Sequence, residues 1–467
     1  MPPSHKSGET TPMPVAERTS NGASSIGKSL AASWDKFLFF ACLLLLAYAV
    51  GLATARFHLP PYDALTEIWG AGRDWAENWR MRLGIEPTQH LAAARDRGAG
   101  LVQHVEGKSM PGVTLMESVF DGDVGLRLID QQGNTLHTWD ALYSEIAPNT
   151  DIVPEFNIPT NDWETMVHGA VLYPDGDVLF NLPGITMVRM NACGEVEWKL
   201  PAMTHHSMHV AEDGNIWTLG RVYYLDQRDP KFPGMRPKFE DDLVLEVSPE
   251  GEILRQISVL EILYANDLIG ALFPTGNGLV DGYTMEDVIH TNDVEILSSA
   301  DAPAFPLFEA GDAMVSFRNL NLLIVFDPDT GVVKWSQTGP WLRQHDPDFL
   351  PDGRILVFDN RDDGARGRLL GGSRLLAIDP LSREVETIYE GTPEAPFFTS
   401  GRGSAERLDN GNFLIVETSH GRVFEVTPDG TMVWSYINRY DADRVVAVNG
   451  AARYPESFAD FDRSGCS

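Results

Sequence analysis

The sequence has only three cysteines in 467 residues, which excludes a disulfide-rich scaffold. Cys42 lies in an apolar run, so only Cys193 and Cys466 could pair, and the sequence leaves open whether they do. Basic residues are also scarce, because 36 lysines and arginines stand against 67 acidic residues, for a net charge of −31. Such a surface repels nucleic acid, which is not expected as a partner. An anionic substrate would need a local cluster of arginine and histidine.

Long apolar runs are rare too, but one uncharged run extends from Phe37 to Ala55 and is long enough to cross a bilayer as a helix. We interpret residues 34–57 as a transmembrane helix and residues 1–33, rich in Ser, Pro, Thr and Gly, as a disordered tail. A cleaved signal peptide is the alternative, since Ala53 to Ala55 has an Ala-x-Ala pattern. The flanking basic residues do not decide the orientation of the helix.

Residues 58–111 carry Trp69, Trp75 and Trp79 among charged residues, a spacing that suits an amphipathic helix. We predict a juxtamembrane helical linker here and assign it no chemistry. The helix could lie at a membrane surface or pack against the domain that follows it.

From residue 112 onward, short β-type runs alternate with Asp-Gly and Asn-Gly turns, which is typical of an all-β fold made of hairpins. A repeat becomes visible when these turns are aligned, because a histidine precedes the turn glycine by the same spacing in three copies. The pairs are His168 with Gly176, His206 with Gly214, and His345 with Gly353. A fourth copy has Gly403 at the histidine position, and His290 begins a fifth. Each copy is followed by a second hairpin.

Repeats of this length, with four strands each, are the signature of β-propeller blades. We place blades near 168–200, 206–260, 290–337, 345–391 and 403–437. Another blade takes three strands from the region before Trp139 and its innermost strand from the C-terminal segment RVVAVNGAARYP, which closes the ring. The predicted fold is therefore an all-β, six-bladed β-propeller over residues 112–467, preceded by a transmembrane helix and a short helical segment. A large sandwich or two smaller β domains is the alternative.

In a propeller, the first strand of each blade lines the central channel, and successive strands run antiparallel. The start of the first strand and the end of the second strand therefore lie on the same face. The histidines that begin first strands are His168, His206, His290 and His345. The residues at or just past the ends of second strands are Arg318, Asn319, Asn360, Arg361 and His420. A single histidine is more often structural, but this repeated pattern predicts a functional cluster at one mouth of the channel.

Clustered arginine and histidine suit a small anion, because arginine donates charge-assisted hydrogen bonds and histidine can donate, accept or attack. A metal site is the competing chemistry, and His205, His206 and His209 come nearest to a ligand pattern. The interspersed arginines disfavour a bound cation, so we expect no metal and no cofactor.

Several segments resemble the blades of bacterial arylsulfate sulfotransferases. They are DVIHTNDVEIL at 287–297, SFRNLNLLIVFDPDTGVVKWSQTG at 316–339, QHDPDFLPDGRILVFDNR at 344–361, and the stretch from GRGSAERL to VWSY at 401–436. The resemblance covers most of residues 160–460. The order of an Asp-x-x-His blade, a His-Asp blade followed by Phe-Asp-Asn, and a final Gly-Arg-Val-Phe-Glu-Val strand is its most specific part.

The resemblance implies an enzyme that moves a sulfuryl group from an aryl sulfate ester to a phenol, without a nucleotide sulfate donor. The implied route is ping-pong, through a sulfohistidine, in the bacterial periplasm. Carried over by motif, His420 is the expected nucleophile, and His345 and His290 stabilise the sulfate oxygens or shuttle a proton. The expected location is the inner membrane, crossed once by the N-terminal helix, with the tail in the cytoplasm and the propeller in the periplasm.

The catalytic arginine of the family follows the Phe-Asp-Asn string, where Arg361, Arg366 and Arg368 are available, and we favour Arg366. The remaining ring residues are expected to bind substrate: His168, His206, Arg318, Asn319, Asn360 and Arg361. Two other functions stay open on the sequence. One is a quinoprotein dehydrogenase, suggested by DPDTGVVKW at 327–335, and the other is a non-catalytic propeller that binds a peptide or glycan.

Overall fold

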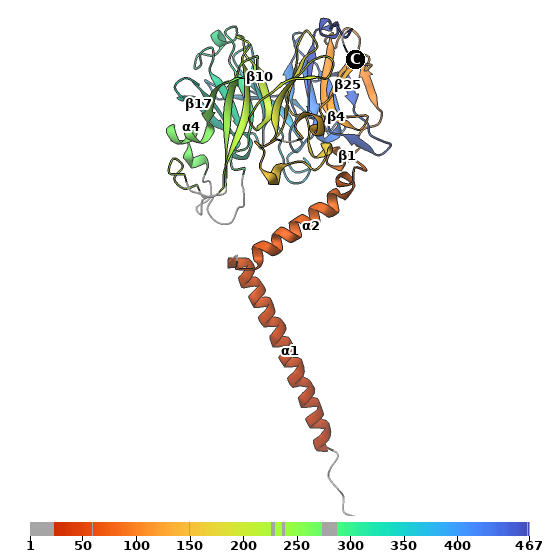
Figure 1. Cartoon of the computed structure of the whole chain (residues 1–467), viewed down its shortest axis with the longest axis vertical. Coiled ribbons are helices and arrows are strands. Elements are labelled where there is room, and N and C mark those ends of the chain that lie inside the picture. The colour runs from red at the N-terminus through yellow and green to blue at the C-terminus, as the bar shows by residue number, and fades with distance from the viewer. Residues whose placement is uncertain are drawn as a thin grey trace, which may run out of the picture. The chain divides into compact units, whose positions relative to one another are not determined.

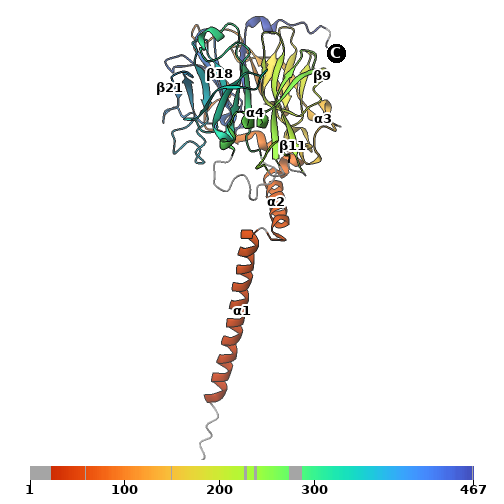
Figure 2. The same cartoon turned by 90° about the vertical axis from the view of Figure 1, so that its left-hand side faces the viewer.

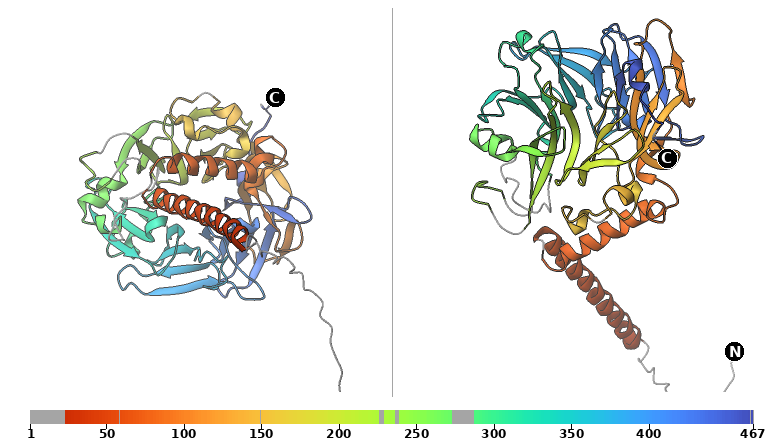
Figure 3. Two further views of the ribbon diagram at one scale, coloured as in Figure 1. Left: turned by 90° about the horizontal axis from the view of Figure 1, so that it is seen from below. Right: turned by 45° about the horizontal axis from the view of Figure 1, so that its top comes forward.

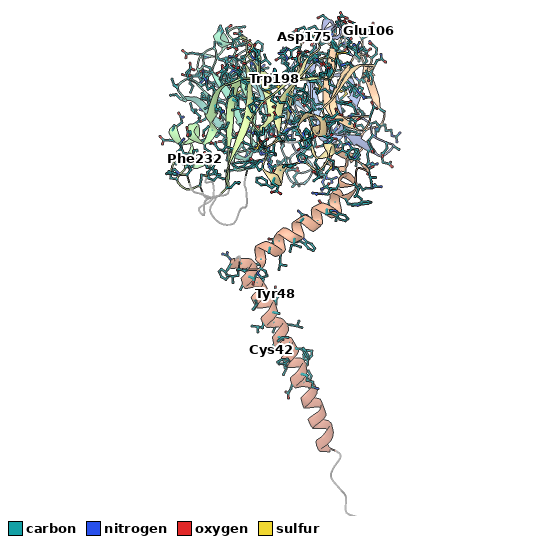
Figure 4. The ribbon with its side chains drawn as sticks, viewed as in Figure 1. Cys42, Tyr48, Glu106, Asp175, Trp198 and Phe232 are labelled. Atoms are coloured by element: carbon teal, nitrogen blue, oxygen red, sulfur yellow. A yellow bond between two sulfur atoms is a disulfide. The ribbon has the colours of Figure 1, made fainter. Side chains whose placement is uncertain are left out.

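The computed structural model describes residues 23–57, 59–148, 150–225, 229–235, 239–272, 287–464 and 466. The chain divides into two compact units, Met1–Trp79 and Arg80–Ser467. The first unit contains helix α1 (Ala23–Phe57), in which Trp34–Phe57 has a mean hydropathy of 2.4 and is long and apolar enough to cross a membrane. The side chains of Trp34–Phe57, Cys42 and Tyr48 among them, project from the helix without burial (Figure 4). The expected membrane-spanning helix is thus present as a structural element.

Helix α2 (Tyr62–Arg82) follows, with Trp69 and Trp75 exposed, as the sequence predicts for part of residues 58–111. From Leu83 onward, the described part of that segment contains the short 3-10 helix η1 (Thr88–His90) and two strands. The strands are β1 (Leu91–Ala93), which pairs with β26 (Arg444–Val446), and β2 (Gly100–His104), which pairs with the outer strand of a blade. The propeller unit therefore begins earlier than residue 112. These strands were missed because both are short and only partly buried, so neither shows a clear alternation of apolar and polar residues.

The second unit is a β-propeller of six blades, as predicted. Each blade is an antiparallel sheet ordered from the axis outward. Blade 1 is β27 (Gly450–Tyr454), β3 (Val113–Phe120), β4 (Asp123–Ile129) and β5 (Thr135–Asp140). Blade 2 is β6 (Ala170–Leu172), β7 (Val178–Leu182), β8 (Thr186–Met190) and β9 (Val196–Lys199). Blade 3 is β10 (Thr204–Val210), β11 (Ile216–Tyr224), β12 (Phe239–Val247) and β13 (Ile253–Ser258).

Blade 4 is β14 (Thr291–Ile296), β15 (Ala313–Phe317), β16 (Leu322–Phe326) and β17 (Val333–Thr338). Blade 5 is β18 (His345–Phe349), β19 (Ile355–Asp359), β20 (Arg374–Ile378) and β21 (Val385–Glu390). Blade 6 is β22 (Ala405–Arg407), β23 (Phe413–Glu417), β24 (Arg422–Val426) and β25 (Met432–Ile437), with β2 added outside β25. The outer strands β9 and β21 lie at the outside of the ring (Figure 2).

Two short helices, α3 (Tyr143–Ile146) and α4 (Val259–Ala265), lie in the connections between blades. Short 3-10 helices include η1 (Thr88–His90), η2 (Glu155–Asn157), η3 (Asp162–Glu164), η4 (Ile269–Ala271), η6 (Ala302–Ala304) and η9 (Glu456–Ala459). Two more, η7 (Arg318–Leu320) and η8 (Thr418–His420), follow the second strands of blades 4 and 6.

The ring is closed by the C-terminal strand, as the sequence predicts. Strand β27 supplies the inner position of blade 1 and pairs with β3, so that Gly450 faces Glu117. The N-terminal strands of blade 1 and the C-terminal strands of blade 6 are neighbours, with β4 and β25 both labelled in Figure 1. In Figure 3 the chain can be followed round the ring by its colour. This closure links the two ends of the propeller sequence and holds the axial residues in one ring.

The hydrophobic core lies between the blades. Within the described residues, a cluster of buried apolar side chains fills each interface between neighbouring blades. Examples are Trp139 against Phe180 for blades 1 and 2, and Phe358 against Phe424 for blades 5 and 6. Burial of each such side chain stabilises the fold by roughly 1.5–3 kcal/mol. Because the apolar side chains pack between the blades, the residues where the inner strands begin, next to the axis, can be polar.

A disulfide joins Cys193, in the turn between β8 and β9, to Cys466 near the C-terminus, with the two Cα atoms 5.0 Å apart. The sequence had left this bond undecided. Cys42 is free and exposed on α1.

Candidate active site

Each blade places one polar side chain near the axis, at or just before its inner strand. We call this set the axial ring: Asn449, His168, His206, His290, His345 and Arg402. His206 contacts His168 and His290 edge to face, with ring centroids 4.9 and 4.8 Å apart. Arg402 donates from its backbone N–H to His345 Nε2 (3.1 Å) and from Nη1 to Asn449 Oδ1 (2.7 Å). Four predicted histidines from four blades therefore meet around one axis.

The backbone is unusual where these side chains leave it. His206 and His290 have φ angles of 59° and 50°, in the left-handed region that non-glycine residues seldom adopt. The pairing of β10 and of β18 with their neighbours shifts register just after His205 and His345. Bulges of this kind re-aim side chains, and strained residues concentrate at functional sites. The positive φ angles and the bulges therefore change the direction of these imidazoles from the one that a regular strand would give them.

His345 is held in a defined tautomer. Its Nδ1 lies 2.7 Å from Asn360 Oδ1 and 3.2 Å from the Arg343 carbonyl oxygen, which are both acceptors, so Nδ1 carries the hydrogen. Burial lowers the pKa of His345 to about 3, and nearby His290 and Arg318 add to this effect. The imidazole is therefore neutral near pH 7, with its lone pair on Nε2.

His290 is oriented by a carboxylate. Its Nδ1 contacts Asp287, and the Asp287 carbonyl accepts a hydrogen bond from Asn319 Nδ2 at 2.6 Å. His290 Nε2 is buried and has no hydrogen-bond partner among the described residues. That nitrogen is consequently the atom that His290 can offer to a bound molecule.

Two arginines accompany the histidines. Arg318 begins η7, donates from its backbone N–H to the His290 carbonyl (3.0 Å) and contacts Asn319 Oδ1 with its guanidinium. In the described part of the chain, neither Arg318 nor Arg402 has a carboxylate within salt-bridge distance. Burial lowers the pKa of both arginines. For Arg318, Asp287 and Asp362 oppose this lowering. Two guanidinium groups without a salt bridge, in a protein of net charge −31, favour an anionic ligand.

A cavity of about 570 Å³ extends along the axis from His168 and His345. Its wall carries many carboxylates, and three of them tie neighbouring blades together by accepting backbone N–H groups. Glu117 accepts from Gly169 (2.9 Å), Asp346 from Ala405 (2.7 Å) and Glu406 from Arg453 (2.9 Å). Burial raises the pKa of each of these three carboxyl groups to about 7. An acidic wall repels an anion, so an anion approaches the ring from the side of the arginines.

Other expected site residues lie outside the axial ring. His420 ends η8, where its Nδ1 is 3.1 Å from the Phe398 carbonyl oxygen and 3.5 Å from Glu417 Oε1. Burial lowers the pKa of His420, against the opposing charge of Glu417, while Arg95 adds to the lowering. No contact among the described residues joins His420 to the axial ring.

The loop after β19 holds the expected arginines. Arg366 is exposed there, and within the described residues its side chain makes no hydrogen bond or ion pair. Arg368 donates to the Ala365 carbonyl oxygen (2.9 Å), and Arg361 has a φ of 48°. The loop is shaped by Asp363, whose carboxylate accepts four backbone N–H groups from residues 365–370.

Sequence reasoning did not assign Arg402, Asn449 or Asp287 to the site. Arg402 could have been found, since it precedes Gly403, which stands at the histidine position of the repeat. Asp287 could also have been found, since it is the first residue of the Asp-x-x-His motif that ends in His290. Asn449 carries no repeat signal, because the strand that follows it comes from the far end of the chain.

Residues 169–439 match the arylsulfotransferase (ASST) family. The chain belongs to this family. The match spans blades 2 to 6 and includes His206, His290, His345 and Arg402 of the axial ring. The family and the propeller fold together support an arylsulfotransferase-type function. No curated protein sequence matches this arylsulfotransferase.

Solved structures similar to this arylsulfotransferase are distant. A protein of unknown function from Bacteroides caccae has 13% identity and a TM-score of 0.46, over 73% of this chain and 98% of its own. Virginiamycin B lyase from Staphylococcus aureus has 11% identity and a TM-score of 0.34, over 62% of this chain and 84% of its own. TolB from Acinetobacter baumannii has 11% identity and a TM-score of 0.37, over 74% of this chain and 67% of its own. None of these similarities indicates an activity.

Proposed function

We propose that this arylsulfotransferase moves a sulfuryl group from an aryl sulfate ester to a phenolic acceptor through a sulfohistidine, without a nucleotide sulfate donor. The observation that carries the proposal is the placement of Arg318 and Arg402 beside the neutral imidazole of His345. Both arginines are partly buried, and neither has a carboxylate within salt-bridge distance among the described residues. A sulfate ester supplies the anion that these guanidinium groups lack. Reaction at an imidazole divides the transfer into two steps of a ping-pong route.

The nucleophile we propose is Nε2 of His345. Asn360 keeps the hydrogen on Nδ1, and the lowered pKa keeps the ring neutral. The Nε2 lone pair, which accepts the Arg402 backbone N–H, attacks sulfur as that N–H moves to a sulfuryl oxygen. The hydrogen bond from Nδ1 to Asn360 can persist after the sulfuryl group has bonded to Nε2. His420 was the residue expected from the family motif, but its ring contacts Glu417 and the Phe398 carbonyl oxygen, which disfavour an incoming sulfate. The nearby Arg95 is already paired with Glu417.

The remaining groups stabilise charge on the transferring sulfuryl group. Its oxygens carry most of the negative charge, as in phosphoryl transfer, so positioned donors are the main requirement. Arg318 and Arg402 supply guanidinium donors. His290, with Asp287 accepting from Nδ1, adds a donor at Nε2 when both of its ring nitrogens carry hydrogen. The Arg402 backbone N–H, 3.1 Å from His345 Nε2, is placed to meet a sulfuryl oxygen once sulfur occupies that nitrogen. In this proposal Arg318 and Arg402 take the role first given to Arg366.

We further propose that residues 34–57 anchor the enzyme in the bacterial inner membrane, with the tail 1–33 in the cytoplasm and the propeller in the periplasm. The apolar helix Trp34–Phe57 supports the anchor. The Cys193–Cys466 disulfide supports an oxidising compartment for the propeller, because such bonds seldom persist in the cytosol.

The transferase activity is tested with 4-nitrophenyl sulfate, in the presence and absence of phenol. We expect nitrophenolate release that depends on phenol, and parallel lines in double-reciprocal plots at several phenol concentrations, as a ping-pong route requires. His345→Asn should abolish release, while His420→Asn should retain it. Absence of release across a panel of phenols would reject the transferase and favour a binding module. Intersecting lines would reject the covalent route.

A further inference from the structure

His205 lies behind the axial ring and has no role in the mechanism described above. Only 1% of its surface is exposed. Its Nδ1 lies 2.8 Å from Nδ1 of His206, and its Nε2 lies 3.1 Å from the Gly220 carbonyl oxygen. On the same side, Oδ1 of the fully buried Asp242 is 3.2 Å from His205 Nε2 and has no hydrogen-bond partner among the described residues. Three titratable groups therefore form a row that leads from a buried carboxylate to the ring.

The hydrogen positions in this row follow from its partners. His205 Nε2 faces two oxygen acceptors, so it carries a hydrogen. If His205 is neutral, its Nδ1 has the lone pair, His206 donates from Nδ1, and the lone pair of His206 lies on Nε2. If His205 gains a proton on Nδ1, that hydrogen bond reverses and His206 Nε2 carries a hydrogen instead. The protonation state of His205 thus decides whether His206 presents an acceptor or a donor to the axis.

A positive charge is better accommodated on His205 than on His206. Burial holds the pKa of His206 well below its usual value, and the neighbouring histidines His290, His168, His205 and His345 lower it further. Burial also lowers the pKa of His205, and Arg221 adds to this, but Asp242 opposes both. Although burial alone would raise the pKa of Asp242, its neighbours His205 and Arg221 hold it below the usual range, so it is a carboxylate. The carboxylate stands next to His205 and away from the guanidinium groups of the ring.

We propose that Asp242, His205 and His206 form a proton relay, in which His206 Nε2 exchanges the proton of the phenolic oxygen. The proposal rests on the transferase function and adds its acid and base. It also assigns His205 and Asp242 as positioning residues, since neither touches substrate. Asp242 has a second contact that suits this role, because its Oδ2 accepts the backbone N–H of Thr291 (2.8 Å) and so fixes the residue beside His290.

The protons balance over the cycle. In the first half, the ester O–S bond breaks as sulfur bonds to His345 Nε2, and the departing phenolate oxygen takes the hydrogen from His206 Nε2. His206 Nδ1 then takes the hydrogen from His205 Nδ1, which leaves His205 neutral. In the second half, the acceptor phenol loses its proton to His206 Nε2 as its oxygen attacks sulfur and the N–S bond breaks. The Nδ1 hydrogen returns to His205, whose new charge faces Asp242.

The relay is tested by comparing two donors in His205→Asn. Asparagine retains an acceptor for His206 Nδ1–H but cannot accept a proton, so it separates positioning from proton transfer. Phenyl sulfate needs a proton on its leaving oxygen, whereas 4-nitrophenolate is a stable anion near neutral pH. We expect kcat/KM for phenyl sulfate to fall about 100-fold, as for loss of a general acid, and that for 4-nitrophenyl sulfate to fall less than about threefold. His209→Asn, in the same strand but paired with Glu295, is the matched control and should change neither value.

A pH profile and a second variant complete the test. With phenyl sulfate, wild-type kcat/KM should fall as the pH rises and the relay loses its proton, and this limb should vanish in His205→Asn. The groups that face the relay are Asp242, Arg221, His168, His290 and His345. If His205→Asn does not fold, as judged by its thermal melt, Asp242→Asn replaces it and should show the same dependence on the donor.

Two results would overturn the relay while leaving the transferase in place. One is an equal fall of kcat/KM with both donors in His205→Asn, and the other is a pH dependence with phenyl sulfate that is the same in His205→Asn as in the wild type. Absence of transfer by the wild-type enzyme from either donor would instead reject the proposed function itself. The two failures are therefore distinguishable in a single set of assays.

Discussion

Asn360→Asp should make the enzyme sensitive to acid. Asn360 is fully buried and contacts the His345 ring at Nδ1. Its Oδ1 accepts from His345 Nδ1, and its Nδ2 donates to the carbonyl oxygens of Arg402 (2.7 Å) and Thr399 (3.0 Å). The aspartate keeps the acceptor for Nδ1 but adds a negative charge beside the imidazole, which favours the protonated and non-nucleophilic ring.

The size of the effect follows from the pKa of His345, which is about 3 in the wild-type protein. A carboxylate in contact raises the pKa of a base by about 1 to 3 units, which brings that of His345 to about 4 to 6. At the upper end of that range, about nine tenths of the rings are protonated at pH 5, so kcat/KM falls about tenfold between pH 8 and pH 5. The wild-type His345 stays neutral over the same interval and contributes no such loss.

The assay is the pH dependence of kcat/KM for 4-nitrophenyl sulfate, which needs no proton on its leaving group. The variant also loses the two donor hydrogen bonds of Asn360, so its thermal melt is recorded at each pH, and activities are compared only where it is folded. Asn360→Ala is the control, because it loses the same donors without adding a charge. An acid limb in Asn360→Ala, or a profile for Asn360→Asp that stays flat down to about pH 4, would refute the account in which burial keeps His345 neutral and the uncharged amide of Asn360 fixes its tautomer.

Three further predictions concern the fold. Cys193→Ser breaks a bridge between residues 273 positions apart, so the free energy of unfolding in urea should fall by about 3–5 kcal/mol while transfer activity in native buffer is kept. Gly450→Ala places a Cβ 2.5 Å from Glu117 Oε1 and displaces the carboxylate from the Gly169 N–H, which should cost about 1–3 kcal/mol in the same urea titration. Glu417→Gln removes the buried charge that pairs with Arg95 and Arg422, and a melting temperature equal to that of the wild type would contradict the expected loss of about 3–5 kcal/mol.

The blades could be predicted from the sequence because their turns carry a strong local signal. Glycines such as Gly176 and Gly353, with φ angles of 88° and 87°, are required by the turn itself and mark the repeat directly. Strands β1 and β2 have no such signal, since they are held by pairing with strands from the other end of the chain. Pairing at such sequence distances leaves no local pattern to read.

The axial ring was predictable only in part, and for a related reason. The repeat aligns the histidines of blades 2, 3 and 5, so their convergence follows from topology. The repeat does not predict, however, in which direction a side chain points when it lies beyond the end of a strand. Arg318 is the first residue of η7 and stays at the ring, whereas His420 is the third residue of η8 and turns toward Glu417. In a 3-10 helix of three residues per turn, the first and third side chains point in different directions, so the repeat alone does not decide which of them reaches the ring.

The central claim is that His345 receives the sulfuryl group, and mass spectrometry of the reacted enzyme tests it most directly. The protein is mixed with 4-nitrophenyl sulfate without an acceptor, quenched under mildly alkaline conditions, digested and mapped by fragmentation. The account predicts the added mass of one SO3 group on the peptide that contains His345, its absence in His345→Asn, and its loss when phenol is added before the quench. An adduct on His420 instead, or turnover with phenol and no adduct on any histidine, would contradict it.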